Sequence, residues 1–311
     1  MKSILILGGG RVGSAIAYDL SKDYSVAVAD INQKALKAIK EKTNAKTICI
    51  DLNDSEKLKH TLENFDIIVS AVPGFMGFNT LKTVIENKKN VVDISFSPED
   101  PFELDKLAQQ NNVTALVDLG VAPGLGNILF GHYDGLMKIE SYECYVGGLP
   151  KVKNKPFEYK APFSPIDVIE EYTRPARLFQ NSKIITKEPL TDLEIISFKT
   201  NEDLEAFNTD GLRTLLQTMS HVPFMKEKTL RYPGHAEKIQ TLKDMGLLSN
   251  KTRKLNKLNY KPIEIAAQLL KEEWDLKDGD EEFTVMKIII KNQRKEIEID
   301  LYDEYNKETQ I

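Results

Sequence analysis

The chain has 311 residues, of which 41% are hydrophobic and 29% are charged, and its formal net charge is −5. These values are typical of a soluble globular protein with room for two cores, and they exclude a largely disordered chain. There is no basic block typical of nucleic-acid binding and no apolar run of the ~18 residues that span a membrane, so we expect neither partner.

Cysteines and histidines limit the redox and metal chemistry of the chain. Cys49 and Cys144 lie far apart in strand-like runs, and we expect two buried, reduced thiols in a cytoplasmic protein. The four histidines show no ligand spacing, so we expect no metal site.

The first strand, expected over residues 2–7, runs directly into a glycine-rich turn. Gly8, Gly10 and Gly13 have the spacing G-x-G-x-x-G, and an amphipathic helix is expected over 12–21. In such a turn the backbone N–H groups of the helix N-terminus, here near Arg11 and Val12, bind a diphosphate. The sequence therefore predicts a nicotinamide dinucleotide site.

A second strand, over 24–30, ends in Asp30, at about the distance expected for an acid that holds a ribose 2′-hydroxyl. Its negative charge repels a 2′-phosphate, and Ile31 and Asn32 supply no arginine to neutralise one. NAD is therefore favoured. NADP stays open, because Lys34 is near enough in sequence to accept a phosphate.

Strands and helices alternate as far as residue 118. Further strands are expected over 45–50, 66–72, 90–94 and 113–118, with helices over 32–42, 54–63, 77–88 and 101–111. Apolar strands separated by amphipathic helices predict an α/β fold with a doubly wound parallel sheet of the Rossmann type. The ends of its strands supply the other expected cofactor contacts, which are Asp51, Leu52, Ala71, Val72, Pro73, Asp93 and Gly120. A helix cap by Asn53 or Asp54 and a plain turn after residue 70 are the alternatives.

The pattern changes near residue 124 to that of an α+β domain. Helices are expected over 125–133, 211–220, 235–245 and 262–275, and strands over 138–145, 183–187, 193–198, 284–290 and 295–301. Residues 151–182 are expected to form a long loop, and the run from Lys251 to Lys261 a solvated one. We divide the chain into a dinucleotide-binding domain, 1–123, and a substrate-binding and dimerisation domain, 124–311.

Five segments in chain order resemble the saccharopine dehydrogenase family, and most closely its short L-lysine 6-dehydrogenase branch. They are the glycine loop and residues 118–124, 146–150, 171–176 and 229–235. The resemblance implies a two-domain homodimer that uses NAD or NADP to oxidise an amine carbon of lysine or a lysine-like amino acid. The expected product is a semialdehyde, formed through an imine. The resemblance also places the following residues along the cleft of the enzyme: Asp93, Asp118, Tyr159, Arg174, Thr209, Arg213, Arg231 and His235.

Members of the family usually continue beyond the segment that matches residues 302–309 with one more helix. This sequence ends at Gln310-Ile311, and we expect domain docking or dimerisation to be altered.

Hydride leaves an amine-bearing carbon only after the nitrogen has lost its extra proton, so the reaction needs a base. Asp93, Asp118 and His235 are the catalytic candidates. The alternatives are a helix-capping role for Asp118 and a place in the first turn of a helix for His235.

Arginine binds carboxylates in a bidentate manner, which makes arginines candidates for holding an amino-acid substrate. The expected substrate-binding residues are Tyr159, Arg174, Thr209, Arg213 and Arg231. An ordinary ion pair is the alternative for each arginine, with Glu170 or Glu171 as the partner of Arg174.

Three functions follow, in order of preference. The first is NAD-dependent oxidative deamination of lysine or a relative, and the second is saccharopine oxidation. The third belongs to another class: an NAD-binding sensor or assembly protein that catalyses nothing.

Overall fold

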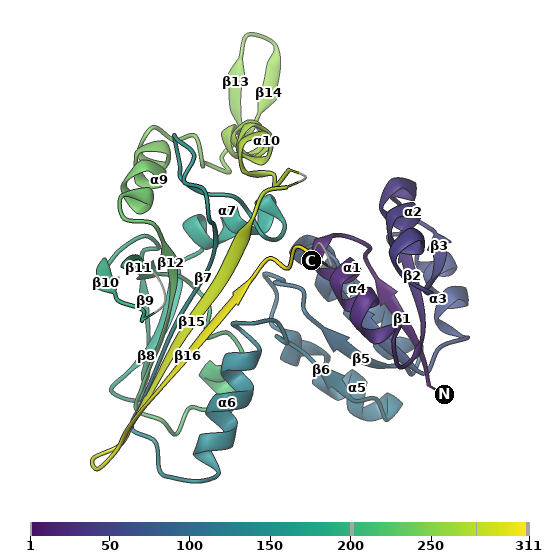
Figure 1. The fold of residues 1–311 in the computed structure, drawn as a ribbon, viewed down its shortest axis with the longest axis horizontal. Coiled ribbons are helices and arrows are strands. Elements are labelled where there is room, and N and C mark those ends of the chain that lie inside the picture. The colour runs from purple at the N-terminus through teal and green to yellow at the C-terminus, as the bar shows by residue number, and fades with distance from the viewer. Residues whose placement is uncertain (1, 200–201, 278, 309–311) are drawn as a thin grey trace. The chain divides into compact units, whose positions relative to one another are not determined.

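The computed structural model describes residues 2–199, 202–277 and 279–308, without the side chain of residue 166. Gln310 and Ile311, where the expectation of altered domain docking or dimerisation was placed, lie outside these residues. The chain divides into two compact units, Met1–Gly120 and Val121–Ile311, each of which is described by itself (Figure 1).

The first unit is built on a six-stranded parallel sheet with strand order β3-β2-β1-β4-β5-β6. This order and the alternation of strands and helices confirm the predicted doubly wound fold. The strands are β1 (Ser3–Leu7), β2 (Ser25–Asp30), β3 (Lys46–Cys49), β4 (Ile67–Ser70), β5 (Asn90–Asp93) and β6 (Ala115–Leu116). The helices are α1 (Arg11–Leu20), α2 (Gln33–Lys42), α3 (Ser55–Leu62), α4 (Gly74–Glu86) and α5 (Asp105–Asn111), with a 3₁₀ turn at Pro101–Leu104.

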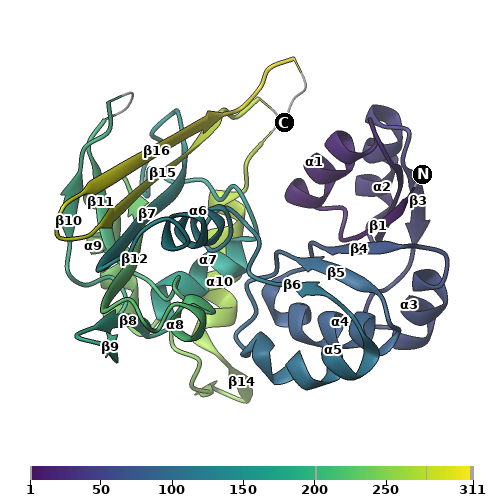
Figure 2. The same cartoon turned by 90° about the horizontal axis from the view of Figure 1, so that it is seen from below.

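Side chains of β1 alternate between the two faces of this sheet, and both faces are buried. Ile4 and Ile6 pack against α1 and α2, whereas Leu5 and Leu7 pack on the side of α3, α4 and α5. Figure 2 shows α1 and α2 on one side of the sheet and α4 and α5 on the other. Burial on both faces explains why the strands read as continuous apolar runs.

Three local expectations for the first unit were wrong. The helix expected over 77–88 begins at Gly74, and the one over 101–111 is divided into the 3₁₀ turn and α5. Cys49 is exposed rather than buried, because it ends the edge strand β3; Cys144 is buried, and both thiols are free.

The second unit is built on an eight-stranded mixed sheet in which β7 is central. Its main path is β10-β11-β12-β7-β15-β16, and β8 pairs with β12 and β9. The strands are β7 (Ser141–Pro150), β8 (Ala176–Gln180), β9 (Lys183–Lys187), β10 (Glu194–Ile196), β11 (Leu204–Asn208), β12 (Phe224–Arg231), β15 (Glu282–Lys291) and β16 (Glu296–Glu304), with a separate hairpin of β13 (Arg253–Leu255) and β14 (Leu258–Tyr260). The helices are α6 (Leu125–Asp134), α7 (Pro165–Thr173), α8 (Leu215–Thr218), α9 (His235–Asp244) and α10 (Pro262–Trp274).

Two apolar clusters hold helices to this unit. Phe130 of α6 and Leu215 of α8 pack with Cys144 and Ile288 against one face of the sheet. Helices α7, α9 and α10 share a second cluster, in which Trp274 is fully buried. The prediction of a strand-and-helix domain without strict alternation is confirmed.

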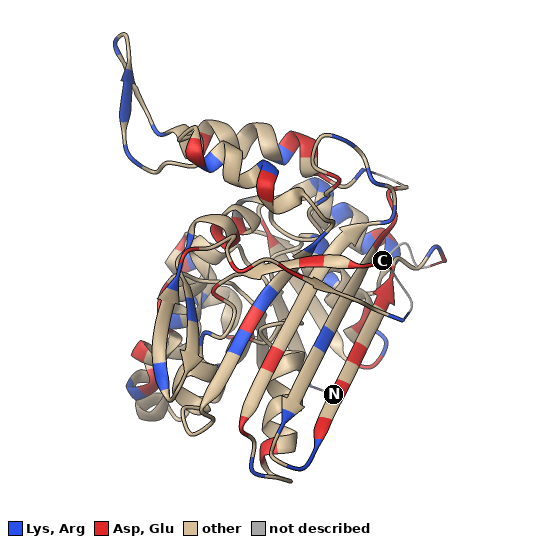
Figure 3. Ribbon diagram, turned by 90° about the vertical axis from the view of Figure 1, so that its left-hand side faces the viewer, with Lys and Arg blue, Asp and Glu red and all other residues tan. Residues whose placement is uncertain are grey.

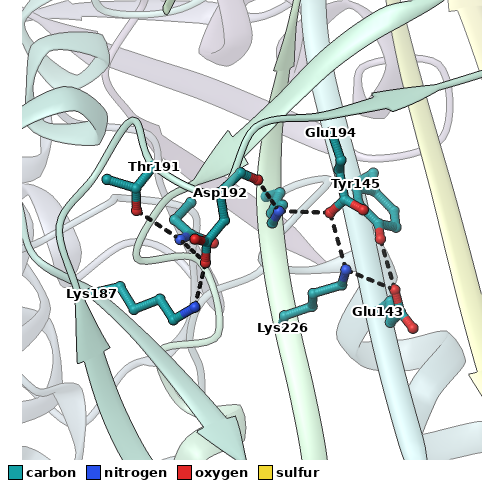
Figure 4. Close-up of polar contacts among 9 residues, drawn as sticks. Glu143, Tyr145, Lys187, Thr191, Asp192, Glu194 and Lys226 are labelled. Carbon is teal, nitrogen blue, oxygen red and sulfur yellow. Dashed lines mark hydrogen bonds and ion pairs between the residues drawn. The ribbon is translucent and has the colours of Figure 1, made fainter. Parts of the chain in front are cut away.

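Charged residues of both signs are interspersed along the strands of this sheet (Figure 3). Lys226 contacts Glu143 and Glu194, each at 3.0 Å, and the Tyr145 hydroxyl donates a hydrogen bond to Glu143 (Figure 4). Lys187 bonds Asp192 in the segment that follows β9. The Lys226–Glu194 contact joins the end of this segment to β12, and the Lys187–Asp192 contact joins the segment to β9.

Sequence reasoning missed several elements of the second unit. The expected loop 151–182 contains α7 and β8, strands β11 and β12 were not predicted, and the helix expected over 211–220 is only the short α8. The expected solvated loop at 251–261 is the β13–β14 hairpin. Strand β12 was missed because Lys226, Glu227 and Lys228 interrupt its apolar pattern.

No helix within the described ranges is long and apolar enough to cross a membrane. Among the same residues there is no group of three His, Cys, Asp or Glu side chains placed to hold a metal ion.

Candidate functional site

The glycine loop between β1 and α1 needs two of its glycines for packing. Gly8 has φ of +100°, and a Cβ there would lie 2.4 Å from the Ala71 carbonyl oxygen. A Cβ on Gly13 would lie 2.0 Å from the carbonyl oxygen of Gly8. These glycines permit the tight turn and the close approach of α1 to β1.

Gly10 serves a different purpose, because no atom lies within 4 Å of the position that its Cβ would take. Gly10 is the N-cap of α1, makes no side-chain cap and is exposed, as are Arg11 and Val12 beside it. The first turn of α1 contains no acidic residue. Open space at the positive end of a ten-residue helix fits the diphosphate of a dinucleotide.

Asp30, at the end of β2, is tied to the loop by its carboxylate. Oδ2 accepts a 2.6 Å hydrogen bond from the Gly9 N–H, and Oδ1 accepts a 2.7 Å bond from the Asn32 N–H. Asn32 then caps α2 by accepting from Lys34 and Ala35. The carboxylate is thus fixed beside the glycine turn and keeps lone pairs for a ribose hydroxyl.

The other predicted cofactor residues lie at the same edge of the sheet. Asp51 accepts hydrogen bonds from Asn53, whereas the cap of α3 is Asp54. Val72 is 5% exposed and its side chain belongs to the core, so the segment Ala71–Pro73 presents mainly backbone to a ligand. Gly120 is exposed at the end of the first unit.

Two buried carboxyl groups lie near the ends of β5 and β6. Asp93 and Asp118 are each 4% exposed, and Asp118 has a left-handed φ of +52°. Asp93 accepts a 2.8 Å hydrogen bond from the Ser95 hydroxyl. Burial raises the pKa of Asp93 to about 6, with a smaller contribution from Asp118 and an opposing one from Ser95. A carboxyl group of this pKa is suited to exchanging protons near neutral pH.

In the second unit, Arg231 at the end of β12 is engaged on all sides. Its guanidinium pairs with Glu171 at 2.7 Å and donates to the hydroxyl groups of Tyr172, at 3.2 Å, and Tyr159, at 3.3 Å. It also lies 4.3 Å from the centre of the Tyr159 ring. Arg231 is 2% exposed, so a substrate carboxylate must compete with Glu171 for it.

His235, the first residue of α9, is buried beside this arginine. Nδ1 lies 3.0 Å from the carbonyl oxygen of Phe157, which only accepts, so Nδ1 carries the proton. Nε2 therefore accepts from the Tyr172 hydroxyl at 3.0 Å. Burial lowers the pKa of His235 to about 3, helped by the charge of Arg231. Both ring nitrogens are thus committed within the protein, and the imidazole is neutral.

Arg174 and Arg213, the other two arginines predicted to bind substrate, both interact within the protein. Burial lowers the pKa of Arg174, the carboxylates of Glu170 and Asp210 oppose that shift, and the positive charge of Arg213 adds to it. Glu170 contacts Arg174 at 3.3 Å. Asp210 is held by Arg177 through two 2.9 Å bonds. Carboxylates thus accompany these arginines, and an anionic ligand of Arg174 has to compete with Glu170.

The remaining predicted residue, Thr209, shares a 2.9 Å hydrogen bond with Thr229. The structure thus groups Tyr159, Arg231 and His235, and Arg213 acts on Arg174 through its charge. Sequence reasoning missed Glu171 and Tyr172 as partners of Arg231, although both stand in a segment singled out by the resemblance.

Comparison with protein families gives two matches that together cover nearly the whole chain. Residues 4–116 match the model of the saccharopine dehydrogenase NADP binding domain. Residues 120–311 match the model of the saccharopine dehydrogenase C-terminal domain.

Similar curated proteins carry related names. A saccharopine dehydrogenase [NADP(+), L-glutamate-forming] of Saccharomyces cerevisiae is 27% identical over 84% of this chain and 61% of its own length. The mitochondrial alpha-aminoadipic semialdehyde synthase of Mus musculus is 25% identical over 80% of this chain and 28% of its own length. The chain thus spans less than two thirds of these relatives.

Two solved structures share the fold. Saccharopine dehydrogenase (L-Glu forming) from Saccharomyces cerevisiae has a TM-score of 0.73 and 19% identity, over 98% of this chain and 86% of that one. Homospermidine synthase from Legionella pneumophila, in complex with NAD, has a TM-score of 0.61 and 14% identity, over 98% and 78% of the two chains.

Proposed function

Since this chain belongs to the saccharopine dehydrogenase family, we propose that it is an NAD-dependent oxidoreductase that acts on the C–N bond of lysine or a lysine-like amino acid. The observation that carries the proposal is the open space at Gly10, at the uncapped N-terminus of α1, beside the fixed carboxylate of Asp30. A diphosphate fits the first feature and a ribose hydroxyl the second.

NAD is preferred to NADP in this proposal, even though the yeast relative is named for NADP(+). The support is electrostatic. Asp30 is anchored by two backbone N–H groups and cannot turn away from a 2′-phosphate without losing both bonds. The next residue, Ile31, is exposed and uncharged.

In this proposal the nicotinamide supplies the hydride acceptor, and the chain moves the protons. Asp93 takes a proton from the substrate ammonium group, because its carboxylate is ionised above pH about 6. Once it has released that proton to solvent, the same carboxylate takes a proton from the water molecule that attacks and hydrolyses the imine. Asp118 lies close enough to raise the pKa of Asp93 and is the second candidate.

Arg174 and Arg213 are proposed to hold the substrate carboxylate. A guanidinium group binds a carboxylate in a bidentate manner, and the substrate competes with Glu170 for Arg174. Tyr159, Thr209 and Arg231 are proposed as further substrate-binding residues of the second unit. For His235 we propose a positioning role, since its neutral ring accepts a hydrogen bond from the Tyr172 hydroxyl and leaves that hydroxyl oxygen to accept from Arg231.

Saccharopine is the second candidate substrate, because relatives at 25–29% identity bear its name. It carries more carboxylates than lysine and needs a second cationic clamp. Arg231 is the obvious residue for that clamp, but it is already paired with Glu171. This pairing favours lysine.

The test compares the two substrates on the purified full chain. Lysine and saccharopine are supplied at equal concentrations with NAD or NADP at alkaline pH, and absorbance at 340 nm is followed. We expect the larger kcat/KM with lysine and NAD. Turnover of saccharopine but not of lysine would show that saccharopine, and not lysine, is the substrate. If neither compound nor any other diamine is turned over, the enzyme assignment is rejected.

A non-catalytic NAD-binding protein is the alternative from another class. It predicts tight NAD binding by calorimetry together with no reduction of NAD across a panel of amino acids. Binding that is strengthened by lysine, followed by turnover, argues against it.

A further inference from the structure

The β13–β14 hairpin is amphipathic, and its apolar face has no cover. Leu255 pairs directly with Leu258, and Arg253 pairs with Tyr260, so these four side chains share one face of the ribbon. Lys254 and Asn259 share the other face. Leu255 and Leu258 are 61% and 65% exposed. An isolated two-stranded hairpin is marginally stable in water, so such a face is expected to pack on something.

The hairpin is also strongly basic. Between residues 246 and 263 there are five cations, Lys251, Arg253, Lys254, Lys257 and Lys261, and no Asp or Glu. The net charge of the whole chain is −5, so the rest of the chain is more acidic still. A surface made by the rest of this chain therefore complements the hairpin in charge.

Helix α10, which follows the hairpin directly, has a matching uncovered face. Ile265 and Leu269 are 51% and 62% exposed and lie one turn apart, on the same side of the helix. Glu264 and Glu272 are exposed along the same helix. The hairpin extends away from α10 within the second unit, so the two apolar surfaces of one copy do not cover each other (Figures 1 and 3).

We infer that the hairpin is a dimerisation arm: its Leu255–Leu258 face packs on the Ile265–Leu269 face of α10 in a second copy of this chain. A two-fold axis lets each arm cover the helix of the other copy, so both apolar surfaces are buried by one closed, isologous contact. Arg253, on the Leu255–Leu258 face of the arm, and Lys257, at its turn, then lie near Glu264 and Glu272 of the partner helix.

The first test measures the mass of the full chain against concentration by analytical ultracentrifugation. We expect a dimer whose dissociation constant rises at least tenfold in Leu255→Ser/Leu258→Ser. Leu136→Ser, which removes an equally exposed leucine elsewhere in the second unit, is the matched control and leaves the dimer unchanged. NAD titration of each variant checks that the first unit is intact. Neither measurement needs turnover, so the dimerisation test can be interpreted even if the proposed enzyme activity is absent.

The second test uses charge exchange. Chains with Arg253→Glu/Lys257→Glu carry glutamates in place of two cations of the arm and keep acidic helices, and chains with Glu264→Lys/Glu272→Lys have basic arms and basic helices. We expect each variant alone to associate weakly and the mixture to form heterodimers. In a Cys49→Ser background, mixed Leu258→Cys and Ile265→Cys chains should form an interchain disulfide.

Several results overturn the proposal. They are a monomer at every concentration, a dimer that the two leucine substitutions leave unchanged, and mixed charge variants that do not pair. Leucine-dependent binding of a monomeric chain to phosphatidylserine vesicles would assign the arm to an anionic membrane instead.

Discussion

Two glycines three residues apart are expected to respond in opposite ways to the same methyl group. At Gly10 the space is open and φ is −69°, so Gly10→Ala should leave the free energy of unfolding within about 0.5 kcal/mol of the original. The new Cβ occupies the place of the diphosphate, so affinity for NAD should fall at least tenfold in a fluorescence titration.

Gly13→Ala is the matched comparison. Its Cβ meets the Gly8 carbonyl oxygen at 2.0 Å, so this variant should lose stability as well as cofactor binding. If NAD binds Gly10→Ala with unchanged affinity, the diphosphate does not lie at this turn.

We expect Asp93 to lower the free energy of unfolding at neutral and alkaline pH, although it supports turnover. Its pKa, raised by burial to about 6, means that the folded protein gives up this proton less readily than the unfolded chain does. The contribution of this carboxyl group to the free energy of unfolding is therefore fully present below pH about 4 and is lost as the pH rises through about 6. Asp93→Asn should raise the free energy of unfolding at pH 8, by on the order of 2 kcal/mol, in urea titrations.

The same substitution should abolish the rise of kcat/KM between pH 5 and 7 that an ionising base produces. Asp23→Asn, at an exposed site, is the control for both measurements. A pH–rate profile that is unchanged in Asp93→Asn would assign the base to Asp118 or to another group.

Single residues were predictable where a motif fixes their backbone. The places of Gly8, Gly10, Gly13 and Asp30 in the turn, the helix start and the strand end were predictable because these features follow one another without a gap, whereas their role in binding a cofactor stays a prediction. The partners of Arg231 were not predictable, because Glu171 and Tyr172 lie about 60 residues away along the chain and approach only in the folded unit.

At the scale of elements, the pair between Arg231 of β12 and Glu171 of α7 joins a strand to a helix in a buried place. Glu171→Gln leaves the arginine charge without its counter-ion and should cost about 3 to 5 kcal/mol of unfolding free energy in urea. The double variant Glu171→Leu/Arg231→Met removes both charges and should recover most of that loss. Equal destabilisation by the single and double variants would mean that the pair contributes through packing and not through charge.

Elements were predicted well where apolar periodicity is unbroken, as along β1, β4 and α10. They were missed where buried charges pair across strands: the lysines of β12 find Glu143 and Glu194 on β7 and β10. The local sequence of such a strand is typical of a polar loop, because the partners that neutralise the lysines are distant in sequence.

At the scale of the whole molecule, all the described contacts proposed for the cofactor's diphosphate and adenosine ribose lie within the first unit. A fragment of residues 1–120 should therefore fold cooperatively and bind NAD with an affinity within about tenfold of the full chain, as measured by calorimetry. A fragment that folds, as judged by circular dichroism, yet releases no heat with NAD would show that the second unit is needed for binding.

The alternation of strands and helices in the first unit was sufficient to predict its architecture. The mixed sheet of the second unit was harder, because its strand order does not follow chain order and its central strand pairs with strands about 80 and 140 residues later.

That central strand has a consequence for how the protein is made. During synthesis β7 leaves the ribosome before either of its paired strands. Its two edges stay unpaired until β12 and then β15 have been made. Until then an apolar ribbon with open backbone groups is exposed to other nascent chains. The second unit should consequently be the slower to fold and the part that aggregates when refolding is attempted at high concentration.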